Sequence, residues 1–137
     1  MNKWLLILGL LLPSGLPAQQ TTVYGKIEIE PPPVYKSVYN LMEDCTGIKG
    51  DFSAVRWAIA DFILVFNEEL SDFGIPAIGM WTDASGYPEI ILVKNFALEL
   101  ETVSHEITHD LFKGDVPMDV AQTCLLRWQR LTPRRPG

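Results

Sequence analysis

The sequence predicts an α+β fold in which a small mixed sheet packs on a helix, with one disulfide bond. Segments of alternating or β-branched residues are interspersed with segments whose apolar residues have helical spacing. A chain of 137 residues with 47% hydrophobic and 20% charged residues is typical of one globular domain. The two cysteines, Cys45 and Cys124, form the even pair that a secreted chain uses as a disulfide.

Residues 1–18 are typical of a secretory signal peptide. Lys3 gives a basic start, residues 4–12 are an apolar run too short to span a bilayer comfortably, and small Ala18 offers a cleavage position. Leu16 fits an A-x-A-like site poorly, so an uncleaved membrane anchor is the alternative. We expect a secreted or periplasmic bacterial protein without stable membrane association after signal cleavage.

The rest of the chain is expected to form one domain over residues 19–131, followed by a disordered tail over 132–137. The formal net charge is −6 and basic residues gather only near the end, so nucleic-acid binding is not expected. A Cys45–Cys124 disulfide would stabilise the domain by about 2–4 kcal/mol. Reactive or metal-binding cysteines are the alternative, but neither cysteine belongs to a C-x-x-C motif.

The first half of this domain predicts strand, helix and strand in that order. Residues 22–30 alternate apolar and polar side chains, as a half-buried strand does. Residues 34–45 have apolar side chains at helical spacing, and Gly47 is placed to end this helix. Residues 52–66 are rich in β-branched and aromatic residues and should contain a core strand, although their second half fits strand or helix equally.

Glycine and proline punctuate residues 71–88, which predicts a loop around a short strand near 77–82 and then a turn at 84–88. Residues 89–94 are a compact apolar strand. This strand could lie at a sheet edge, where an extended peptide can bind by strand addition.

The last third of the chain predicts two helices. The first is expected over 97–113, with Asn95 as its cap and Gly114 as its terminator. A second, amphipathic helix over about 120–131 would carry Cys124 back to the core.

The helix expected over 97–113 carries an H-E-x-x-H motif that includes both histidines of the chain. His105 and His109 are four residues apart, so they share one helix face and could bind one Zn²⁺ ion at about 2.0–2.1 Å each. Glu106 projects beside that face. It could take a proton from a zinc-bound water and pass it to the leaving amine of a peptide bond.

A catalytic zinc ion usually has a third protein ligand, and the sequence leaves its identity open. In the metzincin pattern, H-E-x-x-H-x-x-G-x-x-H/D, this ligand lies six residues after the second histidine, which is Asp115 here. The glycine of that pattern falls on Phe112, so the resemblance is partial. Asp119 is the second candidate, and Asp115 could equally be a solvated or capping carboxylate.

Several segments together resemble a family of small, uncharacterised bacterial secreted proteins with zincin-like H-E-x-x-H helices. They are IEPPPVY (29–35), CTGIKGDFSAVRW (45–57), EIILVK (89–94), VSHEITHDLFKGDVP (103–117) and Cys124, which span nearly the whole mature chain. The resemblance implies a minimal zincin-like, metallopeptidase-like α+β fold with a Cys45–Cys124 bridge.

The chain departs from this family at one informative position. The family has a third histidine in a G-D-H-P segment, whereas GDVP at residues 114–117 places Val116 there. Valine cannot bind a metal ion. Either Asp115 or Asp119 replaces the histidine, or the site binds zinc weakly, or the metal is lost.

Three functions fit the sequence. The first is a secreted or periplasmic zinc-dependent peptidase, expected to be a monomer, with a peptide or protein substrate. The second is a catalytically inactive zincin-like module with an extracytoplasmic binding or structural role, which Val116 favours. The third is a cytoplasmic metal-dependent nuclease, which the signal peptide and the acidic net charge disfavour.

Overall fold

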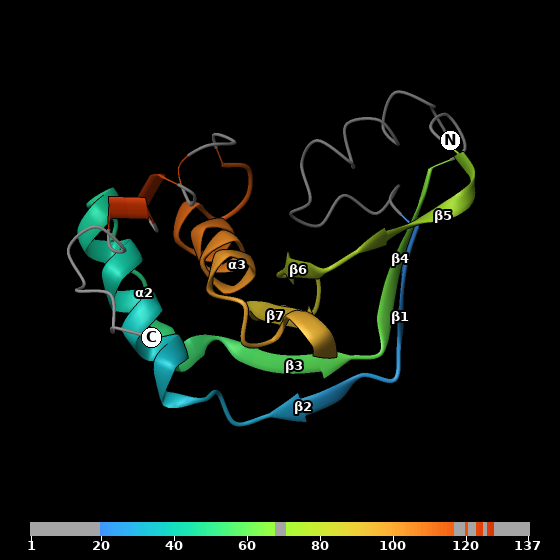
Figure 1. The fold of residues 1–137 in the computed structure, drawn as a ribbon, viewed down its shortest axis with the longest axis horizontal. Coiled ribbons are helices and arrows are strands. Elements are labelled where there is room, and N and C mark those ends of the chain that lie inside the picture. The colour runs from blue at the N-terminus through green and yellow to red at the C-terminus, as the bar shows by residue number, and fades with distance from the viewer. Residues whose placement is uncertain (1–19, 68–70, 117–119, 121–122, 125, 128–137) are drawn as a thin grey trace, which may run out of the picture.

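The computed structural model describes residues 20–67, 71–116, 120, 123–124 and 126–127. Over these residues the fold is mixed α+β, with two sheets, two α-helices and one disulfide bond (Figure 1). The α+β prediction is therefore confirmed. The expected signal peptide (1–18), the C-terminal tail (132–137) and Asp119 lie outside the described residues.

The larger sheet has four strands in the order β2-β3-β7-β6. These strands are β2 (Ile27–Ile29), β3 (Arg56–Ala60), β7 (Glu89–Val93) and β6 (Gly79–Thr82). Strand β7 is parallel to β3 and antiparallel to β6, and β2 is antiparallel to β3. The sheet is therefore mixed, as the sequence predicts.

Strand β7 is an interior strand, so the expectation that residues 89–94 lie at a sheet edge is wrong. All five of its residues are buried. Ile90 and Leu92 belong to a core cluster on one face of the sheet, and Ile91 and Val93 belong to a second cluster on the other face. An unbroken apolar run is what a strand covered on both faces requires. The edge strand next to β7 is β6.

Two helices, α2 (Pro33–Thr46) and α3 (Leu100–Phe112), pack against the same face of this sheet (Figure 1). Helix α2 confirms the helix predicted at 34–45, and Gly47 ends it in the left-handed conformation. The core between the helices and the sheet is built from Tyr35, Tyr39, Met42, Trp57, Trp81, Ile90, Leu92, Val103 and Ile107.

Helix α3 begins later than the sequence predicts. A short 3₁₀ turn, Lys94–Phe96, follows β7, and the α-helix begins only at Leu100. Asn95 lies inside that turn, so it does not cap α3, and the N-cap residue is Glu99. The Tyr35 hydroxyl donates a hydrogen bond to the Ala97 carbonyl, which fixes the connecting segment outside the helix.

The smaller sheet has three antiparallel strands in the order β1-β4-β5 and extends away from the helices (Figure 1). Its strands are β1 (Gln20–Tyr24), β4 (Phe62–Asn67) and β5 (Ser71–Ala77). The second half of residues 52–66 is therefore strand. Residues 71–77 form a strand where a loop was expected, because they pair with the apolar β4.

The strand predicted at 22–30 is divided between the two sheets as β1 and β2. Gly25 separates them with φ +67°, a backbone conformation that residues other than glycine rarely adopt. A Cβ atom at this position would also overlap the Asp61 carboxylate. Alternation alone does not reveal such a break, because both strands keep the same apolar–polar pattern.

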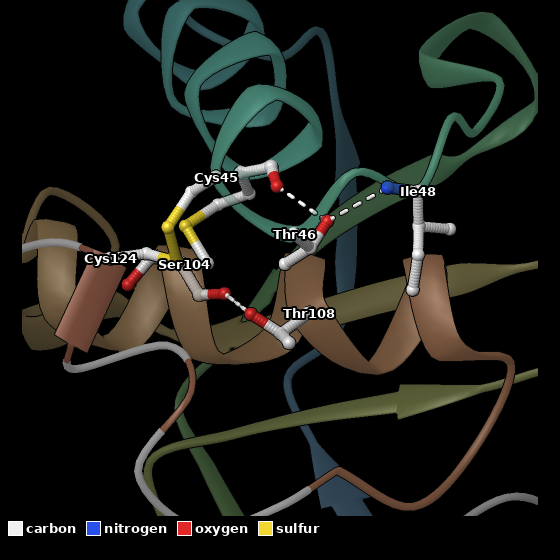
Figure 2. The surroundings of a disulfide bond; sticks show 7 residues. Cys45, Thr46, Ile48, Ser104, Thr108 and Cys124 are labelled. Carbon is white, nitrogen blue, oxygen red and sulfur yellow. Dashed lines mark hydrogen bonds between the residues drawn. A yellow bond between two sulfur atoms is a disulfide. The ribbon is translucent and has the colours of Figure 1, made fainter.

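A disulfide joins Cys45, near the end of α2, to Cys124, with a Cα–Cα distance of 5.8 Å. Figure 2 shows the bridge beside Ser104 and Thr108 of α3. Cys124 is buried in the main core cluster and lies in helical backbone, as the sequence predicts. The bond indicates an oxidising environment. Among the described helices, none is long and apolar enough to cross a membrane.

Candidate active site

The rotation of α3 about its axis is fixed by its apolar stripe. Val103, Ile107 and Leu111 are buried in the core between the helices and the sheet, as their spacing predicts. His105, two positions after Val103, consequently reaches the surface and is exposed. His109, one turn further along, is only 9% exposed.

The two histidines point at each other through the same ring nitrogen. Nε2 of His105 lies 3.2 Å from Nε2 of His109. Two nitrogens bound to one tetrahedral zinc ion at about 2.0–2.1 Å each lie roughly 3.3–3.4 Å apart. In the metal-free chain one Nε2–H can donate to the other Nε2, and a metal ion would replace that proton. The geometry of this pair therefore fits two histidines that bind one metal ion.

The Gly114 carbonyl holds His109 in the tautomer that metal binding needs. Lys113 adopts a left-handed conformation with φ 57° and Gly114 has φ 147°, so the chain turns back over the end of α3. This turn brings the Gly114 carbonyl within 2.6 Å of His109 Nδ1. A carbonyl can only accept, so Nδ1 carries the proton and leaves Nε2 as the free ligand atom. The sequence indicated a helix end at Gly114, but not this contact.

Partial burial of the imidazole and the neighbouring His109 lower the pKa of His105, while the negative charge of Glu101 opposes this effect. A lowered pKa favours the neutral imidazole, which is the form that binds metal ions.

Glu106 is 5% exposed and lies against β6. A Cβ atom added to Gly79 would lie 3.2 Å from Glu106 Cγ and Oε1, so a glycine permits this close approach of strand to carboxylate. Burial raises the pKa of Glu106 to about 8. Sequence reasoning identified Glu106 but not Gly79, because the contact joins residues from two separate elements.

A cavity of about 330 Å³ opens beside Glu106 and His105. It is lined by Ile78, Glu99, Glu101, Thr102, His105 and Glu106. The cavity therefore gives a ligand access to the first histidine and the glutamate of the motif.

Asp110, directly after His109, is fully buried and accepts three hydrogen bonds. The donors are the Tyr39 hydroxyl at 2.6 Å, Trp81 Nε1 at 3.1 Å and Lys113 Nζ at 3.2 Å. Burial, followed by the hydrogen bond to Asp110, raises the pKa of Tyr39 well above its usual range. This network was missed from the sequence, where Asp110 offers no signal beyond its place after the motif.

The structure brings His105, Glu106 and His109 together but leaves the third metal ligand open. Over the described ranges, no group of three or more His, Cys, Asp or Glu side chains is placed to hold a metal ion. Asp115 is exposed and does not complete such a group here. Its role as a ligand stays a prediction, as does that of Asp119.

Comparison of the chain with protein-family models gave no match, and comparisons with curated proteins and with solved structures gave none either. The functional argument therefore rests on the site itself.

Proposed function

We propose that the chain is a zinc-dependent peptidase of the minimal zincin-like type. The observation that carries the proposal is the 3.2 Å separation of the two Nε2 atoms, together with the Gly114 carbonyl that holds the His109 tautomer. Few structural roles require two imidazoles of neighbouring helical turns to direct the same nitrogen at one point.

His105 and His109 would hold the Zn²⁺ ion, with Asp115 or Asp119 as the third ligand. When bound, zinc would supply a Lewis acid that polarises the substrate carbonyl and acidifies water. Asp115 directly follows Gly114, whose carbonyl contacts His109, but this segment would have to rearrange to bring the Asp115 carboxylate to the histidines.

Glu106 would act as the general base. Its carboxylate takes a proton from the attacking water and delivers it to the amine that leaves when the peptide bond breaks. Burial supports this role, because a carboxyl whose pKa is raised toward neutrality can both accept and release a proton. The close approach of Gly79 to Glu106 leaves no room for a side chain at position 79, and Glu106 lines the wall of the cavity.

The disulfide supports an extracytoplasmic location. We infer secretion or export to the periplasm, with residues 1–18 as the signal peptide, and a peptide or protein as substrate.

Zinc binding and peptide hydrolysis by the purified protein test this function together. We expect one zinc ion per chain, and His109→Ala should weaken zinc binding by more than the roughly 10–100-fold that loss of an outer hydrogen-bond partner causes. Glu106→Gln should keep zinc binding but lower kcat by about 10²–10⁴-fold. Asp115→Ala should weaken zinc binding if Asp115 is the third ligand, whereas the exposed Asp83→Ala serves as its matched control.

The second candidate is an inactive zincin-like module that binds or supports another protein. It is favoured by Val116, which stands where the resembling family has its third histidine, and by the open third ligand position among the described residues. Zinc affinity separates the two functions. A zinc Kd of about 1 μM or weaker, without hydrolysis of any peptide, would favour the inactive module.

A further inference from the structure

The cavity beside the motif has an acidic lining. Glu99 and Glu101 contribute two carboxylates, and none of the six lining residues is a lysine or arginine. A ligand that fills this cavity next to the reacting atoms therefore meets a negative potential.

A second, independent feature is a hydroxyl group at the cavity wall that has no hydrogen-bond partner in the part of the chain that the structure describes. Thr102 is 4% exposed and lines the cavity, yet its hydroxyl is buried and has no hydrogen-bond partner among the described residues. Buried hydroxyls are almost always paired, so one left unpaired at a cavity wall suits a ligand that donates to it.

One wall of the same cavity is apolar. Ile78, in the short connection between β5 and β6, is 45% exposed although it is a large aliphatic residue. A long apolar stem that ends in a cation matches such a mixed lining, since the stem covers the aliphatic wall and the cation reaches the carboxylates. Lysine and arginine side chains have this construction.

We propose that this cavity binds a lysine or arginine side chain of the substrate, adjacent to the peptide bond that is cleaved. The stem lies along Ile78, and the cationic head pairs with Glu99 and Glu101 and donates to the Thr102 hydroxyl. The proposal rests on the peptidase function proposed above and assigns Glu99 and Glu101 as determinants of its specificity.

The test compares acetyl-capped and amidated peptides that differ at one position, which is lysine, norleucine or glutamate. Capping excludes capture of a free terminal amine, and uncapped versions measure that contribution separately. We expect kcat/KM to be about tenfold higher for lysine than for norleucine, because each of two partly exposed ion pairs contributes up to about fivefold. The glutamate peptide should be the poorest substrate.

The variant Glu99→Gln/Glu101→Gln should reduce the preference for lysine over norleucine to within about twofold. The matched control is Glu28→Gln/Glu30→Gln, which makes the same change in net charge at two exposed positions outside the cavity. Glu99→Gln alone, at the N-cap of α3, should lose part of the preference and leave the helix folded, because the Glu99 side chain makes no capping hydrogen bond.

A lysine preference that is absent from the wild type, or that falls equally in the control, overturns the proposal while the peptidase function stands. If no peptide is cleaved, the peptidase function fails. Binding of the capped peptides to Glu106→Gln, measured by fluorescence anisotropy, then decides whether the cavity binds a lysine side chain. Selective binding of the lysine peptide that Glu99→Gln/Glu101→Gln abolishes would still support the cavity assignment. Equal binding of the lysine and norleucine peptides would overturn it.

Discussion

At the scale of single residues, Glu106 is a carboxyl group placed in a largely buried environment. The residue is 5% exposed and lies close to Gly79 of β6. Burial disfavours the charged form, which is why its pKa is raised to about 8. A zinc ion at the two histidines would favour the carboxylate, so the protonation of Glu106 and metal binding are expected to be coupled.

The first prediction concerns the stability of the zinc-free protein as a function of pH. Between the unperturbed pKa of 4.5 and the folded pKa of about 8, folded Glu106 keeps a proton that the unfolded chain has released. This stabilising contribution is fully present below about pH 4.5 and is lost as the pH rises through about 8. Relative to Glu106→Gln, the free energy of unfolding should fall by up to about 1.4 kcal/mol per pH unit.

Urea unfolding of the zinc-free wild type and of Glu106→Gln at pH 5, 6, 7 and 8 measures this slope. The exposed Glu28→Gln is the control and should follow the wild type. Parallel curves for the wild type and Glu106→Gln would show that the carboxyl is ionised in the folded chain throughout this range.

The relative placement of the motif residues was predictable, because the periodicity of a helix determines which side chains share a face. The positions of His105, Glu106 and His109 on one helix follow from their spacing, and the structure places all three on α3. The Gly114 carbonyl and Gly79 were not predictable, because each contact depends on how the chain turns after α3 or on which strand lies beside it. The third ligand was left open by the sequence for the same reason.

At the scale of elements, α3 is attached to its neighbours by one buried carboxylate. Asp110 accepts hydrogen bonds from Tyr39 of α2 and Trp81 of β6, and Lys113 pairs with it from the end of α3. All three contacts converge one residue after His109. The network therefore fixes α3 between α2 and the edge strand β6.

The second prediction is that Asp110→Ala destabilises the fold by about 3 kcal/mol, because it leaves the buried Tyr39 hydroxyl and Trp81 Nε1 without partners. Asp44→Ala is the matched control, since the Asp44–Lys49 pair is exposed and should contribute less than about 1 kcal/mol. Chemical denaturation of both variants gives the comparison. Similar small losses for Asp110→Ala and Asp44→Ala would mean that the network is not formed in solution.

Strands and helices were predictable wherever the local pattern had a single interpretation. Helix α2 and its end at Gly47 agree with the sequence, because spacing and a terminal glycine act together. The position of β7 in the sheet was predicted wrongly. Its apolar run indicates that both faces of the strand are buried, but does not indicate whether the strand lies at an edge. The break at Gly25 depends on a contact with Asp61, which lies far away in the sequence.

At the scale of the whole molecule, the disulfide links parts of the chain that are 79 residues apart. Cys45 lies in the last turn of α2, whereas Cys124 comes after α3 and the turn at Gly114. The bridge lies beside Ser104 and Thr108, which immediately precede His105 and His109 in the sequence (Figure 2). It therefore confines the chain on both sides of the motif helix.

The third prediction is that Cys45→Ser/Cys124→Ser lowers the free energy of unfolding by about 2–4 kcal/mol, chiefly because the unfolded chain regains the entropy of a long open loop. Reduction of the wild-type protein should reproduce this loss, and each single variant should match the double variant, since one cysteine alone cannot form the bridge. Urea unfolding under oxidising and reducing conditions measures both effects. Equal stability of the oxidised wild type and the double variant would contradict the prediction, because it would show that the covalent bond adds no net stability.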